Sequence, residues 1–443
     1  MYVYLLLQSH MKTNSDQFNG SSLCNKIKIA FLAHGWNNPI LDASIIIREL
    51  AIQVAKISEM VAFLVVPQNH CTEREKNEAK SHGINIMEAM EQPGFEDPLD
   101  WLNFFSEDIG LDIVVGVGER LGKIAQVLKK RHQCKSIFVA SDFDVQHQEF
   151  QGLLEEIATF KDRELRHKRN VGLCQMADLP VAIGPKMTDR LTVSLCFDKK
   201  SIYPLIPGVI SEFREISDEN RARDYVSRKF RVLVLDANSQ EGLDIAAKAV
   251  AELDDESYHL YYATSAAKRE HEQLARKFYQ HGIAKSQLSI CTLPKRAEGL
   301  KRLFCEVDLA IMPSSEQGFE MVALAALSSA LPILVHEHSG FGEALSPVKS
   351  SQSSIVDSED AKFWAKAIKK IRRTERKTRL AQAASLRSHY DEKYSWEKQF
   401  EPLIQQMMSM ASGMNTYMYM YLSFKLYVKM SIQPKGYLYN INL

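Results

Sequence analysis

The 443-residue chain has no excess of positive or negative charge. Its 55 Lys and Arg residues balance its 55 Asp and Glu residues. Nucleic acids and anionic membranes select basic proteins, so this balance gives no argument for either as the main partner. We therefore expect no nucleic-acid partner.

Paired cysteines and metal-ligand clusters are also missing. The seven cysteines lie far apart, their number is odd, and no CxxC pair occurs. This usage favours a reducing compartment over a disulfide framework, so we expect a cytoplasmic protein. His336 and His338 lie on one face of a predicted strand, but no third ligand lies nearby in the sequence. We expect no metal site, because a lone HxH pair does not make one.

Neither end of the chain carries an apolar run long enough to span a bilayer. Residues 1–7 are apolar, but the run is short and no basic residue precedes it, which is atypical of a signal peptide. Met11 is an alternative start. Residues 415–443 are crowded with Tyr and Met, and we interpret them as an appended tail. We expect no transmembrane span.

Between these ends, short apolar runs alternate with amphipathic helical patterns, and the series occurs twice. The predicted strands cover residues 28–32, 61–66, 84–86, 113–115 and 136–139, then 230–235, 258–262, 288–291, 308–312, 333–335 and 354–356. The predicted helices cover residues 43–57 and a segment from 118, then 242–253, 271–281, 321–329, 361–372 and 376–391. Continuous apolar strands between helices indicate parallel sheets covered on both faces.

The fold class predicted from this pattern is α/β, with two Rossmann-like, doubly wound parallel-sheet domains that face a cleft. The predicted divisions are an N-terminal extension (1–25), a first domain (26–205), a linker (206–229), a second domain (230–410) and a tail (411–443). Ligands of open α/β sheets bind beyond the carboxyl ends of the strands, so the cleft is the expected binding site.

Two strand-to-helix turns in the second domain carry the candidate binding residues. One strand ends in Pro313-Ser314-Ser315, and the loop with Gly318-Phe319 leads into a helix near Met321. The turn from Ser339 to Glu343 follows the next strand. A helix N-terminus that points into a cleft attracts anions through its free N–H groups and its dipole. The alternative is that both are ordinary strand-to-helix turns.

The segments PSSEQGFEMVALAALSSALPILV and SGFGEAL resemble the donor-site signature of glycosyltransferase family 4, the glycosyl transferases group 1. The likeness extends over about residues 26–405 and includes IIIRELAIQVAK, LCQMADLPVAIGP, IPGVISEF, GLDIAAKAVAEL and SEDAKFWAKAI. The resemblance implies a GT-B fold, a nucleoside-diphosphate sugar donor, retaining transfer to an acceptor hydroxyl, and no metal or other cofactor. The residues that match the signature, and that it implies hold the donor, are Ser314, Gly318, Phe319, Ser339, Gly340 and Glu343.

Several positions depart from the family pattern in the second domain. Gln317 and Ala325 stand where the family carries two Glu residues, and Glu320 replaces a Gly. Asp236 and Glu241 stand where an Arg and a Lys would grip the diphosphate. Positive charge stabilises that leaving group, and an ion pair at ~4 Å with an effective dielectric of ~20 contributes about 4 kcal/mol. We therefore assign no catalytic residue.

The first domain departs as well. Leu41-Asp42 replaces an expected Gly pair, and Val117 and Ala140 stand where relatives commonly carry His. His34 and His147 lie near enough in the sequence to substitute. The Gly116-Val-Gly118 segment fits a dinucleotide turn only weakly, and an ordinary strand-to-helix turn is the favoured interpretation.

Three hypotheses therefore stay open. The first is an active retaining glycosyltransferase, and the second is a catalytically degenerate binding module with protein partners. The third is a structural domain of a larger signalling protein. A cation that reaches the cleft from Lys295, Arg296 or Lys301 would favour the enzyme, and the alternative for this cluster is a solvated helix face.

Overall fold

The computed structural model describes residues 26–36, 44–105, 109–141, 155–198, 200–214, 216, 229–235, 240–264, 266–294, 296–315 and 318–412. The predicted N-terminal extension and almost all of the predicted tail lie outside these ranges. The sequence candidates that also lie outside them are Leu41, Asp42, His147, Asp236, Lys295, Glu316 and Gln317.

The described part of the chain contains two parallel sheets, as the alternating pattern predicts. The seven-stranded sheet has the order β3-β2-β1-β4-β5-β6-β7. Its strands are β1 (Ile27–Leu32), β2 (Met60–Pro67), β3 (Asn85–Ala89), β4 (Ile113–Val117), β5 (Lys135–Ala140), β6 (Leu179–Ile183) and β7 (Tyr203–Leu205). Strand β1 pairs in parallel with both β2 and β4, and its last four residues are fully buried, which explains its continuous apolar run.

The six-stranded sheet repeats this order as β10-β9-β8-β11-β12-β13. Its strands are β8 (Phe230–Val234), β9 (Tyr258–Thr264), β10 (Leu288–Thr292), β11 (Leu309–Met312), β12 (Ile333–His336) and β13 (Ile355–Val356). The order reverses between β1 and β4 in the first sheet and between β8 and β11 in the second. In doubly wound folds, ligands bind at the carboxyl ends of the strands beside such a reversal.

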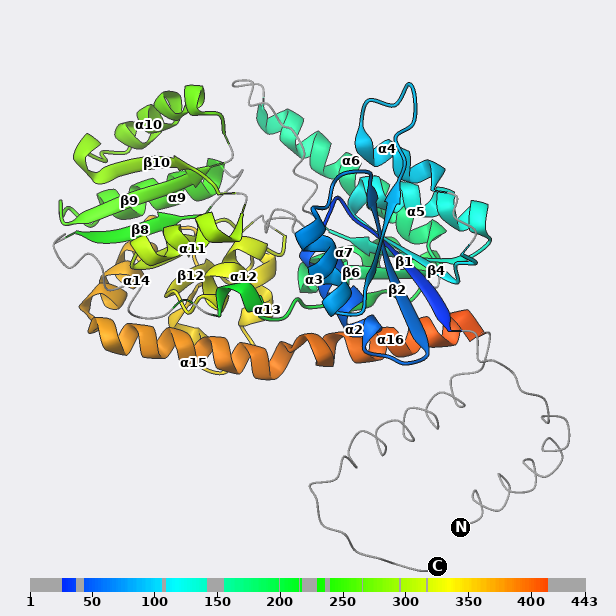
Figure 1. The fold of residues 1–443 in the computed structure, drawn as a ribbon. Coiled ribbons are helices and arrows are strands. Elements are labelled where there is room, and N and C mark those ends of the chain that lie inside the picture. The colour runs from blue at the N-terminus through cyan, green and yellow to red at the C-terminus, as the bar shows by residue number, and fades with distance from the viewer. Residues whose placement is uncertain are drawn as a thin grey trace, which may run out of the picture.

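Helices cover the sheets and bury their apolar sides against them (Figure 1). In the first half these are α2 (Ser44–Ala55), α3 (Glu73–Ser81), α4 (Pro98–Trp101), α5 (Gly118–His132), α6 (Glu155–Met176) and α7 (Pro185–Ser194). In the second half they are α9 (Gln240–Ala251), α10 (His271–Gln280), α11 (Ala297–Glu306), α12 (Met321–Ser328), α13 (Gly340–Leu345), α14 (Ala361–Arg373), α15 (Arg376–Tyr394) and α16 (Trp396–Ser412). The first-half elements from α6 to β7 have no counterpart among the predicted segments.

The end of the chain crosses back to the first half. The orange helices α15 and α16 run along one side of both halves in Figure 1, and α16 packs against α2. The indole N–H of Trp396 donates to the carbonyl of Val209 at 3.0 Å, and the hydroxyl of Tyr390 donates to the carbonyl of Pro207 at 2.9 Å. A side chain at Gly208 would place its Cβ 2.9 Å from the Tyr394 carbonyl oxygen. The connection between the halves is therefore held by the last two helices, and the residue bounds of the two domains stay a prediction.

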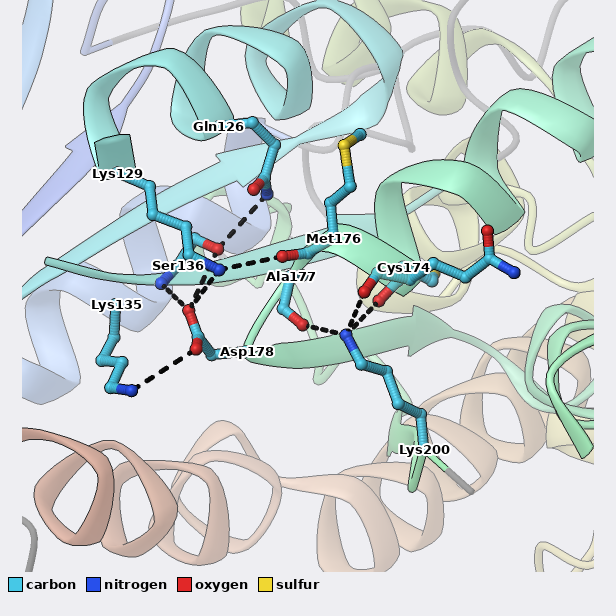
Figure 2. A network of polar contacts seen from close by, with 10 residues as sticks. Gln126, Lys129, Lys135, Ser136, Cys174, Met176, Ala177, Asp178 and Lys200 are labelled. Atoms are coloured by element: carbon cyan, nitrogen blue, oxygen red, sulfur yellow. Dashed lines mark hydrogen bonds and ion pairs between the residues drawn. The ribbon is translucent and has the colours of Figure 1, made fainter. Parts of the chain in front are cut away.

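A polar network fixes the C-terminal end of α6 to the first sheet (Figure 2). The backbone N–H of Ser136 donates to Asp178 at 2.8 Å, and the Lys129 ammonium lies 2.8 Å from the same carboxylate. Lys129 also donates to the carbonyl of Met176 at 2.9 Å. Lys200 donates to the carbonyls of Cys174, Gln175 and Ala177. Two lysines thus satisfy carbonyls that the end of a helix leaves without intrahelical partners.

Within the described ranges, no helix combines the length and apolar character that a bilayer crossing requires.

Candidate functional site

The six sequence-predicted binding residues lie on two neighbouring loops of the second half. One loop follows β11 at the point where the strand order reverses, and the other follows β12, which pairs with β11. The first loop carries Ser314, Gly318 and Phe319, and the second carries Ser339, Gly340 and Glu343 at the start of α13. The fold therefore brings all six together at the carboxyl ends of two adjacent strands, where ligands of this fold class bind.

The two loops touch so closely that only glycine fits at their contact. A Cβ on Gly340 would lie 2.5 Å from the backbone carbon of Gly318 and 2.7 Å from the backbone N of Phe319. A Cβ on Gly342 would lie 1.9 Å from the carbonyl oxygen of His336. Such distances are far below van der Waals contact. A side chain at Gly340 would therefore push the two loops apart, whereas one at Gly342 would distort the second loop itself.

A carboxylate lies against the first loop. The hydroxyl of Ser314, a residue that is 2% exposed, donates to Glu241 at 3.2 Å. The hydroxyl of Ser315 lies 3.4 Å from Glu241 and 3.4 Å from Glu359. Glu241 belongs to the first turn of α9, directly after the strand β8 that pairs with β11. It therefore takes the place beside the loop that the resemblance assigns to a cation.

A second carboxylate is buried between the loops. Glu320 is 8% exposed at the N-cap position of α12, and its Oε2 accepts a hydrogen bond from the backbone N–H of Phe341 at 3.0 Å. Burial raises the pKa of Glu320 to about 7, although hydrogen bonds from backbone N–H groups and from Ser339 and the nearby charge of Lys186 act in the opposite direction. Glu320 thus fastens the first loop to the start of α13, and its raised pKa puts its protonation within reach of neutral pH.

A lysine from the first half reaches both loops. Lys186 lies in the first turn of α7, which follows β6, and its Nζ donates to the carbonyl of Ser315 at 2.6 Å. The same Nζ donates to the carbonyl of His338 at 3.0 Å. The two halves also touch beside this lysine, since a Cβ on Gly184 would lie 2.9 Å from the Phe319 ring. Gly184 has a φ of 80°, which a residue without a side chain adopts readily.

Glu343, His336 and His338 lie at the second loop. Burial raises the pKa of Glu343, which is half-buried, and the nearby charge of Lys186 acts against the shift. His336 is buried at the end of β12, and its Nδ1 accepts a hydrogen bond from the backbone N–H of His338 at 3.1 Å. Burial, followed by the charge of His338, lowers the pKa of His336, while the nearby charges of Glu359 and Asp357 act in the opposite direction. Among the described residues, no group of three His, Cys, Asp or Glu side chains is placed to hold a metal ion.

The other sequence candidates lie apart from these contacts. Arg296 is exposed at the start of α11 and Lys301 is half-buried within α11, and neither forms a hydrogen bond or ion pair with the loop residues that the structure describes. Val117 and Ala140 are buried at the ends of β4 and β5. His34 follows β1, and its carbonyl lies 3.1 Å from Nδ1 of His70.

Lys186 was not among the site residues predicted from the sequence. Its signal was the apolar run Leu179–Ile183 followed by Gly184-Pro185, which marks the end of a strand and the start of a helix. That signal places Lys186 at the carboxyl edge of the first sheet, where it can face the cleft. The contact with Ser315 joins residues 129 positions apart, so it depends on how the two halves assemble.

Two facing Rossmann-like sheets with loops meeting across their carboxyl edges define the class of GT-B proteins, and solved structures of that class match. The Anabaena protein HepE, solved in complex with UDP and glucose, aligns with a TM-score of 0.63 and 12% identity. The alignment covers 86% of this chain and 100% of the HepE chain. Sucrose-phosphate synthase from Thermosynechococcus elongatus aligns over 87% of this chain and 100% of its own, with a TM-score of 0.63 and 13% identity. The fold is that of GT-B glycosyltransferases.

A sequence match assigns the chain to a family. Residues 43–403 match the family described as Family 4 Glycosyltransferase in conflict systems, and the chain belongs to that family. A curated relative, the D-inositol 3-phosphate glycosyltransferase of Corynebacterium urealyticum, is 29% identical over 112 residues. That match covers 25% of this chain and spans about a quarter of the relative, 26% of its length.

Proposed function

We propose that the chain transfers a sugar, with retention, from a nucleoside-diphosphate sugar in the interdomain cleft to an acceptor hydroxyl. The observation that carries this proposal is the position of Lys186, whose ammonium donates to carbonyls of both candidate donor loops. The family pattern expects cations from the second half, where Glu241 stands instead. A cation from the first half supplies the charge that the diphosphate leaving group requires.

The geometry leaves Lys186 able to bind a ligand. An ammonium carries three protons, and two of them point to the carbonyls of Ser315 and His338. The third is available to an oxygen of a phosphate in the cleft. The start of α12, an eight-residue helix that begins after its N-cap residue Glu320, adds backbone N–H groups and the positive end of its dipole.

In this mechanism the protein mainly binds the sugar donor and orients it toward the acceptor hydroxyl. Ser314, Gly318, Phe319, Ser339, Gly340 and Glu343 are the proposed donor contacts. The acceptor hydroxyl attacks the anomeric carbon on the face from which the diphosphate departs, and a departing phosphate oxygen takes the hydroxyl proton. The bond from the sugar to the diphosphate breaks as the new glycosidic bond forms, so no metal or other cofactor is part of the proposal.

A second candidate is a binding module that no longer transfers sugar, and the position of Glu241 favours it. A carboxylate that faces a diphosphate at ~4 Å, at an effective dielectric of ~20, costs about 4 kcal/mol. Each 1.4 kcal/mol is about a factor of ten in rate, so one uncompensated carboxylate would slow transfer by about three orders of magnitude. The two candidates therefore differ in whether the positive charge of Lys186 offsets the repulsion between Glu241 and the diphosphate.

Calorimetric titration of the full chain with UDP, GDP, ADP and their glucose conjugates tests the proposal, together with an assay for donor cleavage. We expect one nucleotide to bind at micromolar concentration. Losing one charge-assisted hydrogen bond costs about 1.5–3 kcal/mol, so Lys186→Met should weaken binding about tenfold to a hundredfold. Arg190→Met removes an exposed cation from the same helix and should leave binding unchanged.

Two results separate the candidates. No heat and no cleavage with any of these donors, on folded protein, would reject the transferase proposal. Nucleotide binding without cleavage, accompanied by tighter binding after Glu241→Gln, would favour the non-catalytic module.

A further inference from the structure

Helix α14 concentrates positive charge in a chain whose net charge is zero. Its thirteen residues include six basic side chains and no acidic one. Five of them follow one another at helical spacing along a single side of the helix. These five residues, which we call the α14 cation stripe, are Lys362, Lys366, Lys369, Lys370 and Arg373.

The α14 cation stripe faces solvent along a groove of about 510 Å³, and Glu252 at the end of α9 is the carboxylate in the groove wall. None of the five side chains forms an ion pair with a residue that the structure describes. The sixth basic residue differs, since Arg372 lies 3.1 Å from Asp255 and covers the Tyr258 ring. In the lining of this groove, five cations face one carboxylate. Their mutual repulsion opposes folding, and an anionic partner would relieve it.

The opposite side of α14 fixes the helix in place. Trp364 and Ile368 are fully buried in the core of the second half, and the Trp364 indole donates to the carbonyl of Ser358 at 2.7 Å. The stripe runs from Lys362 to Arg373, about 16 Å at 1.5 Å per residue. Because the helix is anchored in the core, the row of cations is presented to a partner without an ordering cost for the backbone.

An aromatic ring lies beside the cations. Phe363 is 57% exposed, while its neighbour Trp364 is fully buried. On a helical wheel, Phe363 lies next to Lys366 and Lys370 on the solvent-facing side. An exposed aromatic ring among lysines is able to enter the headgroup and acyl boundary of a membrane while the ammonium groups meet the headgroups.

We propose that the α14 cation stripe docks the protein onto an anionic lipid surface. Clusters of four to eight basic residues on a helix select such surfaces. Four of the five stripe residues are lysines, whereas nucleic-acid recognition favours the planar fork of arginine. The proposal is independent of sugar transfer, since it requires only the described surface of α14.

Vesicle sedimentation of the full chain tests this docking. The probes are vesicles of equal parts phosphatidylserine and phosphatidylcholine, and vesicles of phosphatidylcholine alone. We expect binding to the anionic vesicles only. That binding should weaken as salt is raised from 0.1 M to 1 M, because the Debye length falls from about 10 Å to about 3 Å.

Charge-matched variants locate the surface. Each lysine near an anionic surface contributes about fivefold to partitioning, so the triple variant Lys366→Gln, Lys369→Gln, Lys370→Gln should bind about a hundredfold more weakly. The control variant Lys80→Gln, Lys130→Gln, Lys268→Gln removes three exposed, scattered charges and should bind like the unmodified chain. Phe363→Ser should weaken binding several-fold without changing the net charge. Urea denaturation of each variant confirms that it is folded.

Three outcomes would overturn the proposal. The first is that the unmodified chain does not sediment with the anionic vesicles. The second is an equal loss in the stripe variant and the scattered variant, or no loss in either, since binding would then come from net charge or from another segment. The third is stripe-dependent binding to a DNA oligonucleotide without vesicle binding, which would assign the surface to nucleic acid.

Discussion

Two carboxylates, one in each half of the molecule, have opposite kinds of partner, and only the one in the second half is buried. In the first half, Asp178 lies 2.8 Å from Lys129 and 3.6 Å from Lys135 and accepts from the backbone N–H of Ser136 (Figure 2). In the second half, Glu320 accepts from the backbone N–H of Phe341, and no cation forms an ion pair with it among the described residues.

The difference in partners reverses the direction of the pKa shift. Burial raises the pKa of Asp178, but hydrogen bonds from Lys129 and Ser136 outweigh burial and hold the pKa below its usual range. At Glu320 burial prevails, and the pKa rises to about 7. The first carboxylate thus stabilises the fold as an anion, away from the candidate donor loops. The second lies between those loops and stabilises the fold only when it carries a proton.

Replacing Glu320 has the largest expected effect. Its folded-state pKa of about 7 exceeds the ordinary 4.5, so its contribution is full below the unfolded-state value and is lost as pH rises through 7. A shift of about 2.5 units corresponds to about 3 kcal/mol. Glu320→Gln imitates the protonated acid, so it should match the unmodified protein near about pH 4 and exceed its stability by about 3 kcal/mol near about pH 8.

Urea denaturation of both proteins across this pH range measures the effect. Glu256→Gln, at an exposed position of the same half, serves as the control. A stability difference between Glu320→Gln and the unmodified protein that stays constant with pH would contradict the buried, protonated state of Glu320.

The core of both sheets could be predicted from sequence, because strands buried on both faces appear as continuous apolar runs. The run at β4 (Ile113–Val117) and the run at β8 (Phe230–Val234) show this directly, since both strands lie inside their sheets. Strand β7 (Tyr203–Leu205) escaped prediction because it has three residues, contains Pro204 and lies at a sheet edge. Helix α6 was missed although it is the longest in the described part of the chain.

In the candidate site, too, some residues could be predicted from the sequence and others could not. Ser314 and Gly340 could be found from local turn patterns and the family signature, because both follow strand ends. The buried state of Glu320 could not, since it depends on the Phe341 N–H that a second loop brings to it. Nor could Lys186, whose partners belong to the other half of the molecule. The polar contacts of the two loops depend on segments that are far apart in the sequence, so local patterns could not predict them.

Replacing Asp178 should have an effect of opposite sign and smaller size. Charge-assisted hydrogen bonds contribute about 1.5–3 kcal/mol, so Asp178→Asn should destabilise the protein by about 2 kcal/mol at neutral pH. The lowered pKa means that this contribution is present above the unfolded-state value of about 3.9 and is lost as pH falls through the folded-state value. The gap between the two proteins should therefore close in acid.

Thermal and urea denaturation at neutral and acidic pH measure this gap. Asp254→Asn, at an exposed position, is the matched control. If Asp178→Asn were as stable as the unmodified protein at neutral pH, the network in Figure 2 would contribute no stability, and the contrast with Glu320 would rest on pKa direction alone.

Replacing Lys200 has the smallest expected effect of the three. It distinguishes the stability that comes from the contacts at the end of α6 from the stability that comes from the Asp178 carboxylate. Its ammonium donates to three carbonyls at and just beyond the end of α6. A cation at a helix C-terminus contributes about 0.3–1 kcal/mol, so Lys200→Met should cost about 1 kcal/mol at any pH where lysine is charged. Lys130→Met removes an exposed lysine of α5 and should cost almost nothing. Hydrogen exchange should show faster opening at the end of α6 in Lys200→Met alone. Equal exchange in the two variants would mean that Lys129 and Asp178 hold this helix end without Lys200.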